Sequence, residues 1–82
     1  HLLHLSDTNQ ETDMDQIFQA SLTRAAELLN EAAASLQEAA EAAAGHGNIA
    51  RGGTEYALGS GRRALAVIEA CHTLQTEART AG

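Results

Sequence analysis

The residues best able to support chemistry lie near the C-terminal end, where Glu69 and His72 form a Glu-x-x-His motif. On a helix this spacing places a carboxylate and an imidazole one turn apart, as in di-iron carboxylate bundles. A complete metal site needs further inward-facing acids. In a folded hairpin the nearest ones are Glu27 and Glu31, which point away from the apolar side of their helix. We therefore expect no metal and no cofactor, and we keep a metal-binding or di-iron-type helical bundle as the alternative hypothesis.

Cys71 and His72 are neighbours in the sequence and resemble a thiolate–imidazole pair. Adjacent helical residues diverge by about 100°, so the two side chains do not face each other. We expect Cys71 to be a small core residue and the protein not to be an enzyme. Because Cys71 is the only cysteine, no intramolecular disulfide forms, which favours a cytoplasmic location.

The composition favours helices over sheets. The chain has 82 residues, which is enough for one domain. Hydrophobic residues make up 44% of it, but half of these are alanines, and proline is absent. Alanine is the best helix former and proline the worst, so we predict an all-α protein.

A coiled-coil-like pattern predicts a first helix over about residues 13–44, with Asp13 at its start. Small and large apolar residues alternate with the 4,3 spacing of a helix-packing seam. The predicted seam consists of Phe18, Leu22, Ala25, Leu29, Ala32, Leu36, Ala39 and Ala43. Its alanines predict a close approach of a second helix, closest near Ala39–Ala43.

A glycine-rich segment, residues 45–53, predicts the turn. A second helix is expected over about 54–79, with Thr54 as its cap. A start at Asn48 is the alternative, and it would place two glycines inside the helix at a cost of about 1 kcal/mol each.

The second helix repeats the seam pattern, so the two helices should form an antiparallel hairpin. Its predicted seam is Ala57, Gly61, Ala64, Ile68, Cys71, Gln75 and Ala78. Residues 1–12 are predicted to be a flexible N-terminal arm, which leaves 13–82 as the single helical domain. The first five residues, HLLHL, lack the features of a signal peptide.

The apolar surface of each helix is too wide for a single neighbour to cover, which predicts a homodimer that forms a four-helix bundle. A lone hairpin of this size also has few large apolar side chains to bury. The expected dimer core consists of Phe18, Leu22, Leu29, Leu36, Leu65, Ile68 and Leu74.

The charge pattern limits the kinds of partner. The chain has a net charge of −6, from eleven acids and five arginines, and contains no lysine. This disfavours nucleic acids and anionic membranes, because both are bound through clustered cations. A surface for a protein partner is predicted from four acids, Glu27, Glu31, Glu38 and Glu41, and from three arginines, Arg51, Arg62 and Arg63.

The functional prediction is a small acidic interaction module without enzymatic activity. It would act as a regulator, adaptor or inhibitor through protein–protein contacts, as a homo-oligomer. The rows of glutamates also allow an inhibitor that mimics nucleic acid. Many alanines and arginines with no lysine favour a GC-rich bacterial or phage genome.

Overall fold

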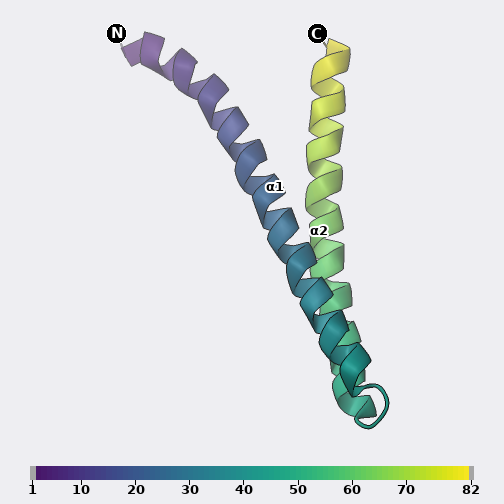
Figure 1. Cartoon of the computed structure of the whole chain (residues 1–82). Coiled ribbons are helices and arrows are strands. Elements are labelled where there is room, and N and C mark those ends of the chain that lie inside the picture. Colours follow the sequence, from purple (N-terminus) through teal and green to yellow (C-terminus); the bar gives the residue numbers. More distant parts are fainter. Residues whose placement is uncertain (1, 82) are drawn as a thin grey trace.

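The fold is an antiparallel helical hairpin (Figure 1). The computed structural model describes residues 2–81, with side chains from residue 14 to residue 80. Helix α1 spans Leu2–Ala42 and helix α2 spans Gly47–Ala81. The two helices pack against each other and give an elongated molecule of 65 × 27 × 12 Å. The predicted all-α hairpin is therefore confirmed.

The first helix begins earlier than the sequence pattern predicts. Residues 2–12, the expected flexible arm, continue α1 as helix, so Asp13 does not start it. This segment contains no proline or glycine. Extending an existing helix by one residue costs much less than nucleating a new one, which explains the continuation. The side chains of residues 1–13 lie outside the described part of the chain.

The turn is shorter than expected and consists of residues 43–46, where 45–53 was predicted. The backbone N–H of Ala50 donates to the carbonyl of His46 at 3.1 Å, which starts the second helix. The alternative start at Asn48 is therefore close to the observed start at Gly47, and the prediction that the second helix begins at Thr54 is wrong.

A close contact between the helices explains why α2 includes glycines in its first turns. A Cβ atom on Gly53 would lie 2.9 Å from the backbone oxygen of Ser35 and 3.0 Å from the Cβ of Ala39. Thr54 does not cap the helix; its hydroxyl donates to the carbonyl of Arg51 at 2.8 Å. The packing gained along this extra length offsets the poor helix propensity of glycine.

Gly53→Ala is expected to lower the free energy of unfolding by about 1 kcal/mol. Its Cβ would press on a backbone atom that cannot move aside, and such overpacking costs about 1–3 kcal/mol. The better helix propensity of alanine offsets part of this overpacking cost. Gly59→Ala is the control, because no atom lies within 4 Å of a Cβ at Gly59. In thermal unfolding followed by circular dichroism, Gly59→Ala should unfold at a higher temperature than the wild-type protein. If Gly53→Ala is also more stable than the wild-type protein, the close contact at Gly53 is contradicted.

The seam of α1 is shifted by one residue in one of its two predicted rows. The row of Phe18, Ala25, Ala32 and Ala39 does face α2. The other row is one residue earlier than predicted, and consists of Ser21, Leu28, Ser35 and Ala42. Leu22, Leu29 and Leu36 were predicted in the seam, but each is 45–49% exposed.

Helix α2 shows a weaker form of this shift. Its row of Ala57, Ala64 and Cys71 is buried as predicted. Beside it, the row of Gly53, Ser60 and Val67, one residue earlier than the predicted row, is buried or partly buried. The predicted residues Gly61 and Ile68 are partly buried as well, so the shift is clearest at Ser60. Small side chains therefore face each other across the hairpin, and they let the two backbones approach closely.

Leu28 is the largest buried side chain among residues 14–80, at 3% exposed. Ser60 is 1% exposed, and its hydroxyl has no hydrogen-bond partner in the described part of the chain. A buried hydroxyl without a partner is unfavourable. Its presence indicates that small size matters more than polarity at this position.

The helices are closest near the turn and diverge toward the two termini (Figure 1). This agrees with the predicted close approach near Ala39. Neither α1 nor α2, over residues 2–81, contains an apolar stretch long enough to cross a membrane.

Candidate interaction surfaces

The four predicted acids lie along one flank of α1, which we call the acidic strip (Glu27, Glu31, Glu38 and Glu41). At about 100° per residue, positions that are three, four, seven and eleven apart share one side of a helix. Glu31 is partly buried and the other three are exposed. The strip is about 21 Å long, at 1.5 Å per residue.

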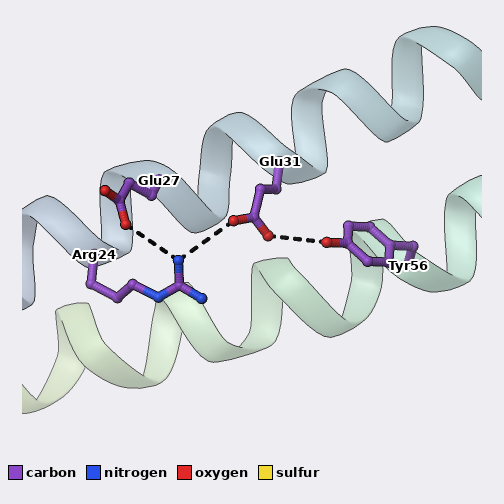
Figure 2. Close-up of polar contacts among 4 residues, drawn as sticks. All are labelled: Arg24, Glu27, Glu31 and Tyr56. Carbon is purple, nitrogen blue, oxygen red and sulfur yellow. Dashed lines mark hydrogen bonds and ion pairs between the residues drawn. The ribbon is translucent and has the colours of Figure 1, made fainter.

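A polar network connects the acidic strip to α2 (Figure 2). The hydroxyl of Tyr56 donates to one carboxylate oxygen of Glu31 at 3.1 Å. Arg24 lies 3.5 Å from the other oxygen and 3.3 Å from the carboxylate of Glu27. Glu31 therefore connects the two helices, whereas Glu38 and Glu41 have no ion-pair partner among the described residues. This leaves their charge available to a partner.

The three predicted arginines do not gather into one patch. Arg51 is exposed near the start of α2 and pairs with Glu55 at 3.3 Å. Arg62 and Arg63 are adjacent, so their side chains point about 100° apart. Arg62 lies at the edge of an apolar groove.

Large apolar side chains form a second surface, which we call the leucine face (Leu22, Leu29, Leu36, Leu58 and Leu65). These five residues are 45–55% exposed. On α1, Leu29 and Leu36 stand two positions from acids of the strip, which places them about 160° away around the helix, and Leu22 is five positions, or about 140°, from Glu27. The hairpin therefore has one apolar side and one acidic side.

A groove of about 420 Å³ runs along the leucine face. It is lined by Leu36 of α1 and by Leu58, Gly61 and Leu65 of α2. Gly61 lies between the two α2 leucines, and a Cβ there would have no atom within 4 Å. The groove is thus open above this glycine.

The predicted core of the dimer is largely exposed in the single chain. Leu22, Leu29, Leu36, Leu65 and Leu74 are exposed, and Phe18 and Ile68 are partly buried. Leu74 follows the seam row of Val67, but it is 53% exposed.

The residues considered for chemistry are divided between the seam and the surface of α2. Cys71 is buried in the seam at 5% exposed, as expected for a small core residue. His72 and Glu69 are exposed, and His72 lines a shallow depression with Phe18 and Gln75. Across residues 14–80 no group of three acids, histidines or cysteines is placed to hold a metal. The metal hypothesis needs two hairpins, so it stays a prediction that elemental analysis of the purified protein would test.

No protein-family model matches the chain, and the comparisons with curated proteins and with solved structures also give no match.

Two features of these surfaces were missed from the sequence. Tyr56 was not predicted to bond Glu31, although it is the only tyrosine of the chain. Leu58 was not included in the predicted dimer core. Its seven-residue spacing from Leu65 was the signal in the sequence that the two leucines lie in one row on α2.

Proposed function

We propose that this protein is a small interaction module without enzymatic activity that acts as a regulator, adaptor or inhibitor in a homo-oligomer. One observation supports this most: among residues 14–80 most leucines lie on the surface, while the contact between the helices uses mainly small side chains, with Leu28 as the one buried leucine. Contiguous apolar patches on a protein surface mark sites that other molecules cover.

The acidic strip supports a partner with a basic surface. Glu38 and Glu41 are exposed on one flank, and nearby Glu27 is exposed as well. Charges of this kind speed the encounter with an oppositely charged surface and limit the choice of partner. Inhibition by mimicry of nucleic acid is a special case of this proposal. The single cysteine, which is buried, supports a cytoplasmic location as part of it.

Reversing the charge of Glu38 and Glu41 together tests this proposal. The variant Glu38→Arg/Glu41→Arg should keep the helicity of the protein, because both side chains are exposed. It should lose at least about tenfold in the association rate with the partner at low salt, since charged pairs at the rim act mainly on that rate. Capture from an extract of the native host, followed by stopped-flow kinetics with the captured partner, gives the measurement.

A control with the same change in charge is Glu69→Arg/Glu77→Arg, on exposed positions of α2. The partner should bind this control at nearly the wild-type rate. Equal rates for the two double variants would show that the strip is only a solvated surface. Glu31 is left intact in both, because its carboxylate holds Tyr56.

A further inference from the structure

We propose that the leucine face docks against the same face of a second copy of this chain, related by a two-fold axis. The proposal rests on the homo-oligomer proposed above and names the surface that forms it. A two-fold interface uses one patch twice, so the patch must complement itself.

The spacing of the leucines on the two helices allows the leucine face to complement itself. The α1 leucines recur every seven residues, which is about 10.5 Å along a helix. Leu58 and Leu65 on α2 have the same spacing, with Gly61 between them. A leucine from α1 of the second copy fits the groove above Gly61, as a knob fits a hole in packed helices. The two-fold axis repeats this contact in the other direction.

The exposed area of the hairpin is large enough for such an interface. The chain exposes 6410 Å². A compact monomer of 8.6 kDa exposes about 4,700 Å², so the hairpin has roughly 1,700 Å² in excess. A standard interface buries about 800 Å² per partner. This excess belongs to the whole elongated chain, and it is about twice the area that each partner buries in a standard interface.

The charge distribution permits a second copy on this face. A protein of net charge −6 repels its own copies wherever acids face each other. Between residues 19 and 40 of α1, the leucines are flanked on their outer side by Gln19, Ala26, Ala33 and Ala40, which are uncharged. The acidic strip lies on the other flank of α1 and stays in solvent. On α1 the pairing thus buries leucines without bringing acids together. On α2, Glu55 and Glu69 are the exposed acids near Leu58 and Leu65, and the cation Arg62 lines the groove between them.

Gly61 has no packing role within the single hairpin, unlike Gly53. A glycine inside a helix costs about 1 kcal/mol relative to alanine, and no atom of the hairpin lies within 4 Å of the missing Cβ. In the proposed dimer Gly61 does have a packing role, because the open space above it admits the leucine of the second copy.

The first test measures the mass of the full chain by sedimentation equilibrium between micromolar and about 100 µM, a range within that of weak protein pairs. The wild-type protein is expected to be a dimer. Leu65→Glu should raise the dissociation constant at least about 30-fold, because it replaces apolar contact area with a carboxylate that must lose its hydration in the interface. Ala66→Glu adds the same charge on the next residue, which is exposed outside the face, and should leave the constant nearly unchanged.

The second test fills the groove without adding charge. Gly61→Leu should weaken the dimer at least about tenfold, whereas Gly59→Leu, outside the groove, should not. Both variants should remain helical, because neither Cβ meets an atom of the hairpin. This pair keeps the test valid if Leu65→Glu fails to fold.

A monomeric wild-type protein over this range would overturn the proposal, as would a dimer that both Leu65→Glu and Gly61→Leu leave intact. If the protein is monomeric and its partner is lost in Leu65→Glu, the leucine face binds a different protein. If the protein is monomeric and its partner binding still depends on Glu38 and Glu41, the proposals of self-docking and of a homo-oligomer are wrong. The proposal of an interaction module is then still supported.

Discussion

Replacing Leu28 by alanine is expected to lower the free energy of unfolding by about 2–5 kcal/mol, the range for leucines truncated in a protein core. Leu28 is 3% exposed and is the one leucine of residues 14–80 that is buried. A small domain has little stability in reserve, so this loss should unfold a large fraction of the molecules. Urea unfolding followed by circular dichroism measures the change.

Leu29→Ala is the matched control, one residue along the same helix. Leu29 is 45% exposed in the hairpin, so its truncation should cost below about 1 kcal/mol at a concentration where the chain is monomeric. At higher concentration the cost should grow, because Leu29 belongs to the face proposed to dimerise. If Leu29→Ala lowers the free energy of unfolding more than Leu28→Ala at low concentration, the seam predicted from the sequence is the correct one.

Ala64→Leu is expected to destabilise the hairpin by about 1–3 kcal/mol or more, through overpacking. Ala64 is 0% exposed and lies where α1 and α2 pack through small side chains. A leucine there has no space unless the helices move apart, and that movement breaks the contacts of neighbouring seam residues. The midpoint of thermal unfolding measures the effect.

Ala66→Leu controls for the added side chain, because Ala66 is exposed on α2. It adds the same atoms to the outer surface and should change stability by no more than about 0.5 kcal/mol. If both leucine variants unfold at the same temperature, the close packing at Ala64 is absent in solution.

The hairpin was predictable from the sequence because its signals are local. Alanine content and heptad spacing indicated two long helices, and the glycines around residue 45 indicated the turn. The helix ends were less predictable. Gly52 and Gly53 are poor helix residues by themselves, and only the contact of Gly53 with Ser35 and Ala39 shows why α2 extends through them.

The register of the seam was wrong by one residue because two neighbouring rows fit the same spacing. Leu22, Leu29 and Leu36 follow a 4,3 pattern with the alanine row, and Ser21, Leu28 and Ser35 follow it equally well. Hydrophobicity favours the leucine row. The structure uses the other, because small side chains let the helices approach more closely than a row of leucines would.

The two surfaces were also predictable only in part. Each row along one helix follows from the 3.6-residue repeat, so the acidic strip could be assigned from sequence alone, as could the common side of Leu22, Leu29 and Leu36. The pairing of Tyr56 with Glu31 and the groove at Gly61 depend on how far one helix is rotated and shifted against the other. That placement is set by the sizes of side chains from two distant segments in contact, which no pattern within a single segment contains.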